Sequence, residues 1–334
     1  MNNTERVEYI DLLRGIGIIL MTIGHVGFTV NIEKWIYAFH MPLFYCVSGW
    51  FFNNHSTITA KIKKLSLKLL VPYFSFGLMY YFIWILVNFA SGIQNKNILD
   101  PLSHLLFINT DGVPISPALW FLTSLFWVEI IYAVLDKIFQ NKIFLLSIVI
   151  IVLAVLGTGL PSYFGVRLPW ALDTAFVGIG FYHLARVLKN TIKYPISTSP
   201  TIKCFGMAVI LLTVATFSAF INGYVNMRRG LYSSIPLFWI NAVMMILSIW
   251  VIVLLTSKYV NNKCFQWIKT IGKNSITYVC LNHLVVKALL ILALKSGHNG
   301  LIVHGLILLV SLGILWILDF LFRKTLLKVF LGQW

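Results

Sequence analysis

Charged residues are scarce in this chain of 334 residues, and acidic ones are the scarcest. Only 11% of the residues are charged, with 10 Asp and Glu against 26 Lys and Arg, whereas soluble domains carry roughly 25%. Hydrophobic residues make up 59% of the chain, and the mean hydropathy is +0.87. A soluble globular protein is therefore excluded, and the chain requires lipid as its solvent.

Cysteine is also rare, which removes two classes of site. The four residues Cys46, Cys204, Cys264 and Cys280 have no metal or redox spacing, and a buried cysteine commonly serves as a small apolar side chain. We expect no metal site. Internal repeats, low-complexity tracts and a separate soluble domain are absent too, so residues 1–334 are predicted to form a single transmembrane domain.

Apolar segments of about 20 residues, the length that spans a bilayer as a helix, recur along the chain. They predict an all-α polytopic helical bundle of about ten transmembrane helices. The first lacks the basic start and small-residue cleavage site of a signal peptide, so we interpret it as a retained helix. The predicted segments are 9–30, 34–52, 69–90, 118–138, 142–160, 169–188, 203–221, 235–256, 275–296 and 300–322.

The Lys and Arg residues gather on one side of this predicted topology. Basic loops stay cytoplasmic in membrane proteins, so both termini are predicted to be cytoplasmic, in a bacterial inner or cytoplasmic membrane. Anionic lipid headgroups attract such clusters. The bilayer therefore accounts for the net charge of +16, and we expect no nucleic-acid partner.

Ionisable residues inside apolar helices are costly and mark functional candidates. In the first segment, Asp11 and Arg14 are three residues apart and can pair. Arg14 and His25 lie three turns apart on one stripe, about 16 Å along the axis. A phosphate-bearing donor with a long arm fits this spacing, with Arg14 holding the anion and His25 acting at the far end. Alternatively, Asp11 and Arg14 only neutralise each other and His25 bonds a neighbouring helix.

His40 adds a second imidazole. If the first two segments form a hairpin with its turn near Ile32 and Glu33, His25 and His40 lie seven residues on either side of the turn, at similar depth. Pro42 loosens the following helix, which favours a polar pocket rather than a lipid-facing surface. A purely structural hydrogen bond from His40 within the bundle is the alternative.

Several motifs, taken in order, resemble the acyltransferase 3 family over essentially the whole chain, with the closest similarity to fucose 4-O-acetylase-like and related polysaccharide O-acyltransferases. The spacing of Arg14 and His25 alone is weak, but the ordered set is fairly specific. The motifs are Arg14 and His25, Phe39-His40-Met41-Pro42-Leu43-Phe44, Ser48-Gly49, Leu70-Val71-Pro72-Tyr73, Leu119-Trp120-Phe121-Leu122, Asn274-Ser275 and Asn282-His283.

The resemblance implies an acyl-CoA donor, with acetyl-CoA as the favoured form, and no tightly bound cofactor. It implies a sugar hydroxyl as acceptor, on a cell-surface glycan or its polyprenyl-linked precursor. His25 is implied as the catalytic histidine and Arg14 as its required partner. The arginine-rich segment of the family is replaced here by lysines, of which Lys64 and Lys68 are candidates for binding donor phosphates, although lysine lacks the bidentate geometry of arginine. Topology and lipid contact are the alternative role for these lysines.

We expect neutral His25 to act as a general base on the acceptor hydroxyl, with a transient acyl-histidine as the alternative. His40 is the candidate for a second proton carrier or for a donor to the tetrahedral oxyanion.

Five further residues are weaker candidates. His283 and Lys287 are four residues apart on one helix face, and we expect one of them to contact donor phosphate from the inner half of the membrane. Glu129 is a candidate for orienting a histidine or binding sugar, against a structural ion pair. Trp120 and Asp173 are candidates for contacting the acceptor.

A transporter or flippase for a glycan precursor is the alternative function, because buried charges also line translocation paths. Internal symmetry and paired broken helices would favour it, and the sequence has neither. An inactive membrane scaffold is disfavoured by the arrangement of Arg14, His25 and His40.

Overall fold

The structure, a computed structural model, describes residues 8–53, 55–92, 97–106, 117–140, 142–191, 202–257 and 263–333. Within these residues it is helical, apart from one isolated bridge between Asn226 and Leu231. The α-helices are α1 (Glu8–Val26), α2 (Val30–Tyr37), α3 (His40–Trp50), α4 (Ile58–Leu65), α5 (Val71–Ala90), α6 (Leu99–Leu106), α7 (Trp120–Phe139), α8 (Ile143–Phe164), α9 (Leu172–Thr191), α10 (Ile202–Asn222), α11 (Ile235–Ser257), α12 (Lys263–Lys273), α13 (Ser275–Lys295) and α14 (Leu301–Lys324). The short helices are η1 (Ser66–Leu70, a π-helix), η2 (Pro117–Leu119), η3 (Pro169–Ala171), η4 (Met227–Arg229) and η5 (Leu326–Leu331).

Seven helices in the described part of the chain are long and apolar enough to cross a membrane, which confirms an all-α polytopic bundle. They are α1, the continuous helix Ile58–Ala90, α8, α10, α11, α13 and α14. Helices α7 and α9 each have 20 residues but carry charges, and Asp136 of α7 pairs with Arg186 of α9. Ten spans and cytoplasmic termini stay predictions.

The predicted second span, 34–52, is two helices rather than one. The chain turns at Gly27, whose φ of 75° suits glycine, and the Thr29 side chain then caps α2 by accepting from the Ile32 N–H. The predicted turn near Ile32 and Glu33 is therefore wrong, because both residues lie within α2. A second break follows at Phe39, since Pro42 has no N–H and is tolerated only in the first turn of α3.

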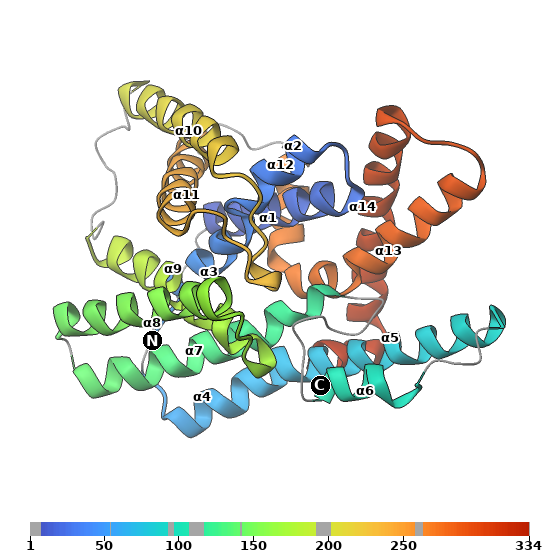
Figure 1. Cartoon of the computed structure of the whole chain (residues 1–334), viewed down its shortest axis with the longest axis horizontal. Coiled ribbons are helices and arrows are strands. Elements are labelled where there is room, and N and C mark those ends of the chain that lie inside the picture. Colours follow the sequence, from blue (N-terminus) through green and yellow to red (C-terminus); the bar gives the residue numbers. More distant parts are fainter. Residues whose placement is uncertain are drawn as a thin grey trace.

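Helix α1 lies in the middle of the molecule (Figure 1) and packs against α12, α13 and α3. Contact with α12 is so close that a Cβ atom added to Gly272 would lie 1.8 Å from the Asp11 carbonyl oxygen. Helix α12 is not among the predicted segments, because its 11 residues have too little apolar length for a span. Its backbone contact fixes the end of α1 that carries Arg14.

The helix predicted at 69–90 begins earlier, at Ile58, and contains the π-helical turn η1 at Ser66–Leu70. The Val71 N–H bonds the Ser66 carbonyl, and Pro72 has no N–H to continue the regular ladder. Wide turns of this kind occur often at functional sites. Here the turn carries Lys68 and directly follows the turn that carries Lys64.

Candidate active site

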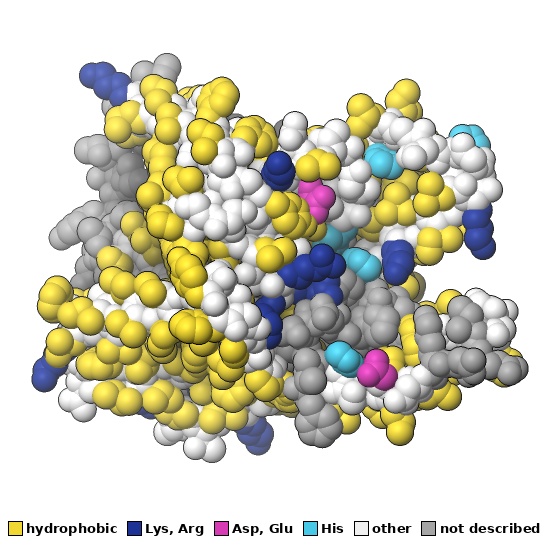
Figure 2. Space-filling model, viewed as in Figure 1, with side chains coloured by type: hydrophobic (Ala, Val, Ile, Leu, Met, Phe, Trp, Pro, Cys, Tyr) yellow, Lys and Arg dark blue, Asp and Glu magenta, His cyan; other side chains and the backbone are white. Residues whose placement is uncertain are grey.

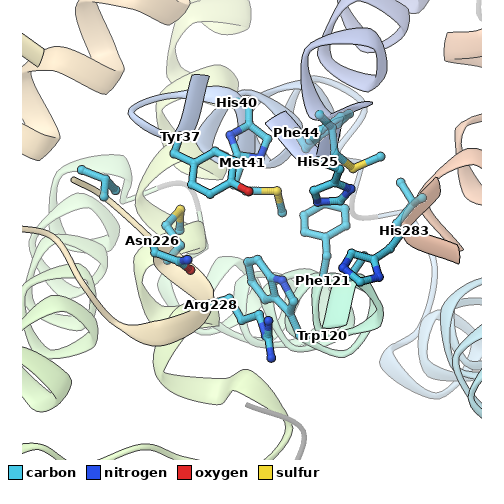
Figure 3. A pocket seen from close by; sticks show the side chains of 15 residues that line it. His25, Tyr37, His40, Met41, Phe44, Trp120, Phe121, Asn226, Arg228 and His283 are labelled. Atoms are coloured by element: carbon cyan, nitrogen blue, oxygen red, sulfur yellow. The ribbon is translucent and has the colours of Figure 1, made fainter. Parts of the chain in front are cut away.

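A cavity of about 160 Å³ surrounds His25, and we call it the His25 cavity. Helices α1, α2, α3, α7 and α13, the short helix η2 and the segment between α10 and α11 contribute to it. Figure 3 shows the imidazoles of His25, His40 and His283 and the indole of Trp120 arranged around the opening. The lining residues are Met21, His25, Tyr37, His40, Met41, Phe44, Ala118, Trp120, Phe121, Val225, Asn226, Met227, Arg228, Val279 and His283.

A chain of hydrogen bonds fixes the tautomer of His25. Thr22 donates its hydroxyl proton to the Ile18 carbonyl (2.9 Å), so its oxygen can only accept from the Asn282 side-chain amide (2.5 Å). The carbonyl oxygen of Asn282 must then face His25 Nδ1, at 2.7 Å. An amide oxygen accepts, so Nδ1 carries the proton and Nε2 of the neutral ring keeps its lone pair. His25 is thereby prepared to act as a base through Nε2.

His40 has the same tautomer for a different reason. Its Nδ1 lies 2.9 Å from the Ile36 carbonyl oxygen and donates to it, so Nε2 of the neutral ring is an acceptor. Because Nε2 of His40 accepts, the ring is suited to carrying a proton or orienting a hydroxyl, and it is not suited to donating a hydrogen bond to an oxyanion. As predicted, His25 and His40 line one cavity. His283 joins them, with its ring edge-to-face with that of His25 at 5.4 Å between centroids.

A second cavity, of about 540 Å³, lies beside the N-terminal half of α1 and is lined by Arg14. We call it the Arg14 cavity. Its described lining contains five basic side chains and no Asp or Glu. Lys64 and Lys68, predicted to bind donor phosphates, both belong to this lining. The lining residues are Arg14, Phe44, Ser48, Lys64, Leu67, Lys68, Leu69, Phe121, Leu122, Leu125, Lys273, Ser275, Ile276, Val279, Arg323, Leu331, Gly332 and Gln333.

The two arginines of the Arg14 cavity each pair with a carboxylate outside the cavity lining. Arg14 Nη1 lies 3.9 Å from Asp11 Oδ1, at the outer limit of an ion pair, and its guanidinium lies over the Phe51 ring. Arg323 Nε donates to Asp319 Oδ1 at 2.8 Å. Neither Asp11 nor Asp319 lines the cavity, so the carboxylates orient the arginines while an excess of positive charge faces the cavity.

Phe44, Phe121 and Val279 line both cavities and form a partition between them. The rings of Phe44 and Phe121 lie 5.7 Å apart between centroids. Gly17, between Arg14 and His25 on α1, leaves room for this partition, because a Cβ atom there would lie 3.0 Å from the Phe44 ring. Basic side chains therefore concentrate on one side of three apolar residues and histidines on the other.

The expectation that His283 or Lys287 contacts donor phosphate does not fit the structure. His283 lines the His25 cavity rather than the Arg14 cavity, because it lies two turns along α13 from Ser275. Lys287 is exposed and lines neither cavity. These placements remove the geometric basis for a contact between either residue and donor phosphate.

The two predicted substrate carboxylates are in ion pairs. Glu129 lies 3.4 Å from Lys61 Nζ, which is the structural alternative foreseen for it. Asp173 is fully buried and accepts from Arg167 Nε at 2.6 Å. Neither lines the His25 cavity, whereas Trp120 does.

The connection between α10 and α11 is held by hydrogen bonds within itself and to α2. Tyr224 donates its hydroxyl to Glu33 of α2 at 2.8 Å. Burial, together with this carboxylate, raises the pKa of Tyr224, so the phenol keeps the proton that it donates. Asn226 accepts from the Arg229 N–H and so caps η4. The loop is thereby fixed against α2 beside the cavity.

Four residues of the candidate site were not predicted from the sequence: three that line the cavities, and Asn282, which lines neither but bonds His25. Lys273 and Arg323 were assigned to topology, and Arg228 to an outer loop. Asn282 stands next to His283 in a motif that had already been noted, but its pairing with His25 joins residues 257 positions apart. Of the four, only Asn282 carried a signal in the sequence, as an amide inside an apolar helix.

Comparison with protein families gives one match, to the acyltransferase domain model of the acyltransferase 3 family, over residues 7–320. The chain belongs to the acyltransferase 3 family. It is therefore a multi-pass membrane acyltransferase, and the resemblance carried by its motifs is confirmed. The match favours the acyltransferase over the transporter or flippase. Neither the curated proteins nor the solved structures contain a match to the chain.

Proposed function

We propose that this acyltransferase 3 protein transfers an acetyl group from acetyl-CoA to a hydroxyl of a sugar, on a cell-surface glycan or its lipid-linked precursor. The observation that carries the proposal is the separation of two cavities by Phe44, Phe121 and Val279. One cavity has the charge to hold a polyphosphorylated donor, and the other has the bases to activate a hydroxyl.

The donor binds in the Arg14 cavity. Acyl-CoA carries its phosphates at one end and its thioester at the end of a long flexible arm. Arg14 and Arg323 offer planar guanidinium groups for charge-assisted, bidentate contacts with phosphate. Lys64, Lys68 and Lys273 add point charges. The arm then runs along α1 past Gly17 and through the partition. It delivers the thioester next to His25, which lies about 16 Å along the helix axis from Arg14.

The acceptor hydroxyl binds in the His25 cavity, with its proton directed at His25 Nε2. As the hydroxyl oxygen attacks the thioester carbonyl, His25 takes the proton and a new C–O bond forms. The C–S bond then breaks, and the CoA thiolate recovers the proton from the imidazolium. Asn282 holds the ring in the required tautomer, and His40 Nε2 accepts a bond from the same or a neighbouring hydroxyl. A transient acyl-histidine remains the alternative.

The partition favours a short acyl group. Three apolar side chains separate the cavities, so a two-carbon acyl group meets fewer obstacles than a long one. On the acceptor side, Trp120 and Tyr37 offer aromatic faces next to polar groups, as carbohydrate sites commonly do. These features support the O-acetylation expected of the fucose 4-O-acetylase-like subgroup.

The test uses membranes that contain the protein, radiolabelled acetyl-CoA and the glycans of the host cell. We expect label to enter the glycan fraction with wild type and with Lys287→Gln, whose exposed side chain lies outside both cavities. We expect His25→Ala at equal abundance to transfer roughly 10²–10⁴-fold less. Equal transfer by His25→Ala and wild type would overturn the proposal.

A further inference from the structure

The proposed reaction creates a negative charge that neither His25 nor His40 can bind. When a hydroxyl oxygen attacks the thioester carbonyl, the carbonyl oxygen becomes an oxyanion, and active sites for acyl transfer stabilise it with hydrogen-bond donors that are already in place. Both histidines present an acceptor at Nε2, because their Nδ1–H groups bond the Asn282 side chain and the Ile36 carbonyl. The oxyanion therefore requires a donor from elsewhere in the lining of the His25 cavity.

Two neutral donors in this lining are available. The Tyr37 hydroxyl and the Trp120 indole N–H form no hydrogen bond with any residue in the described part of the chain. The Asn226 amide, in contrast, donates to the Tyr224 hydroxyl at 3.4 Å. Tyrosine and tryptophan donors that are shielded from water usually have a partner. A molecule bound in the cavity is the expected partner for these two.

The ring of Tyr37 is fixed beside His25. It packs against α1 at Gly24, where a Cβ atom would lie 2.9 Å from Tyr37 Cε1, the ring carbon next to the one that carries the hydroxyl. The ring centroid lies 5.1 Å from that of His40 and 5.8 Å from that of Tyr224. Figure 3 shows the hydroxyl pointing into the opening, on the side of His25. Contacts with α1, α3 and the connection between α10 and α11 thus hold one donor in place beside the base.

We propose that Tyr37 is a catalytic residue that donates a hydrogen bond to the tetrahedral oxyanion. The inference rests on the proposed function and adds a residue to its site. As the acceptor oxygen forms the new C–O bond, the π electron pair of the carbonyl moves onto its oxygen, and the Tyr37 O–H bonds that oxygen without giving up its proton. When the C=O bond forms again, the C–S bond breaks, and the CoA thiolate takes the proton held by His25.

A neutral donor suits this position next to a general base. A cation in contact with His25 would oppose its protonation, whereas a phenol that keeps its proton at neutral pH does not. Figure 2 shows Lys, Arg and His side chains gathered near the centre of this face, and their field favours a developing anion at longer range. Tyr37 adds the directed bond that fixes where the oxyanion lies.

A stable analogue of the tetrahedral state tests the inference without an acceptor. A methylphosphonate group replaces the acetyl group of acetyl-CoA, so that anionic oxygens on a tetrahedral phosphorus stand where the oxyanion forms. The affinities of this analogue and of acetyl-CoA are measured by calorimetry on purified protein in lipid nanodiscs. A site that is complementary to the transition state binds its analogues more tightly than the substrate. We expect wild type to bind the analogue about tenfold or more tightly than acetyl-CoA.

Tyr37→Phe keeps the ring and removes the hydroxyl. The affinity for the analogue should fall about tenfold or more, because a bond to a charged group is lost, while the affinity for acetyl-CoA stays near that of wild type. The kcat of transfer should fall roughly 10²–10³-fold. Tyr81→Phe is the matched control and should behave like wild type, since the Tyr81 hydroxyl donates to the Ile98 carbonyl at 3.2 Å and the residue lines neither cavity.

Trp120→Phe separates the two available donors. It removes the indole N–H but keeps an aromatic face for the sugar, so we expect it to retain the preference for the analogue. An unchanged preference in Tyr37→Phe, a larger loss in Trp120→Phe than in Tyr37→Phe, or an equal loss in Tyr81→Phe would overturn the inference. So would the absence of any preference in wild type. An equal loss of acetyl-CoA and analogue affinity in Tyr37→Phe would make the phenol a support of the fold, which also overturns it.

Failure of the proposed function gives a different pattern. If binding of the analogue depends on Tyr37 but no labelled acetyl group reaches any glycan, the oxyanion site stands and the proposed acceptor is wrong. If transfer to glycan depends on His25 while Tyr37→Phe keeps both kcat and the preference for the analogue, the reaction stands and the inference is wrong.

Discussion

Replacing Asn282 by leucine separates the positioning of His25 from its chemistry. Leucine has nearly the shape of asparagine but cannot accept from His25 Nδ1, which lies 2.7 Å from the Asn282 carbonyl oxygen. The imidazole then lies in an apolar site with an unsatisfied Nδ1–H, or it moves the proton to Nε2. In the first state nothing holds the ring, so the Nε2 lone pair that should take the acceptor proton is misplaced. In the second state Nε2 is protonated and this lone pair is lost.

The magnitude follows from the one bond removed. Leaving a buried donor without a partner costs about 1–3 kcal/mol, which corresponds to a fall in kcat of roughly 5- to 150-fold. Thr22→Val removes only the second link, in which Asn282 donates to the Thr22 oxygen at 2.5 Å. Because His25 keeps its acceptor, we expect a smaller fall, about 3- to 10-fold. Asn282→Asp keeps an acceptor on Nδ1 and should recover much of the activity lost in Asn282→Leu.

The assay measures acetyl transfer by purified protein in liposomes at saturating acetyl-CoA, with kcat and donor KM determined separately. A positioning role lowers kcat and leaves donor KM unchanged, since Asn282 lines neither cavity. Nitrogen NMR of isotope-labelled histidine reports the tautomer of His25, with His25→Ala identifying its signal. We expect the Nδ1–H tautomer in wild type and a different or mixed state in Asn282→Leu. A kcat of Asn282→Leu within twofold of wild type, or an unchanged tautomer, would refute the reasoning.

The remaining predictions concern donor, chemistry, partition and topology. Arg14→Gln should weaken acetyl-CoA binding and raise donor KM about tenfold or more, and Arg14→Lys should recover part of the affinity; unchanged binding would leave Arg14 as a structural partner of Asp11. His25→Ala should bind acetyl-CoA like wild type by calorimetry yet fail to turn it over, and a matching loss of binding would contradict the extended donor. Phe44→Ala should widen the partition and raise turnover of longer acyl-CoA relative to acetyl-CoA, whereas an unchanged ratio would free Phe44 of this role. Single cysteines at exposed Ser296 and Lys63 should label from opposite sides of the membrane, and labelling of both from one side would contradict the predicted topology.

Properties that depend on composition and period were predictable from the sequence. The length of the apolar segments located the helices, because a single segment that spans lipid satisfies its backbone hydrogen bonds by forming a helix. The break at Phe39 was missed because it depends on a single proline, Pro42, inside an apolar run. Helix α12 was missed because its stability comes from packing on α1 at Gly272, not from its own hydrophobicity.

The candidate site also has features that were predictable from the sequence and features that were not. Residues on one helix were predictable, since the spacing of Arg14 and His25 fixes their separation. Contacts between distant segments were not predictable. The spacing of residues along the chain could not show whether Glu129 binds sugar or pairs with Lys61. Nor could it assign His283 to the cavity of His25. Both outcomes depend on how α13 and α7 are rotated within the bundle.

The two cavities also bear on the fate of the thioester. In one open cavity, water reaching the basic residues would also reach the activated acyl group, and the donor would be hydrolysed rather than transferred. Three apolar side chains line both cavities and lie between the basic side chains of the Arg14 cavity and His25. On the proposed function, the acyl arm of the bound donor passes between these three side chains. The thioester then meets the base only when the arm has excluded water from the passage, and an acceptor hydroxyl held on the far side becomes the nearest nucleophile.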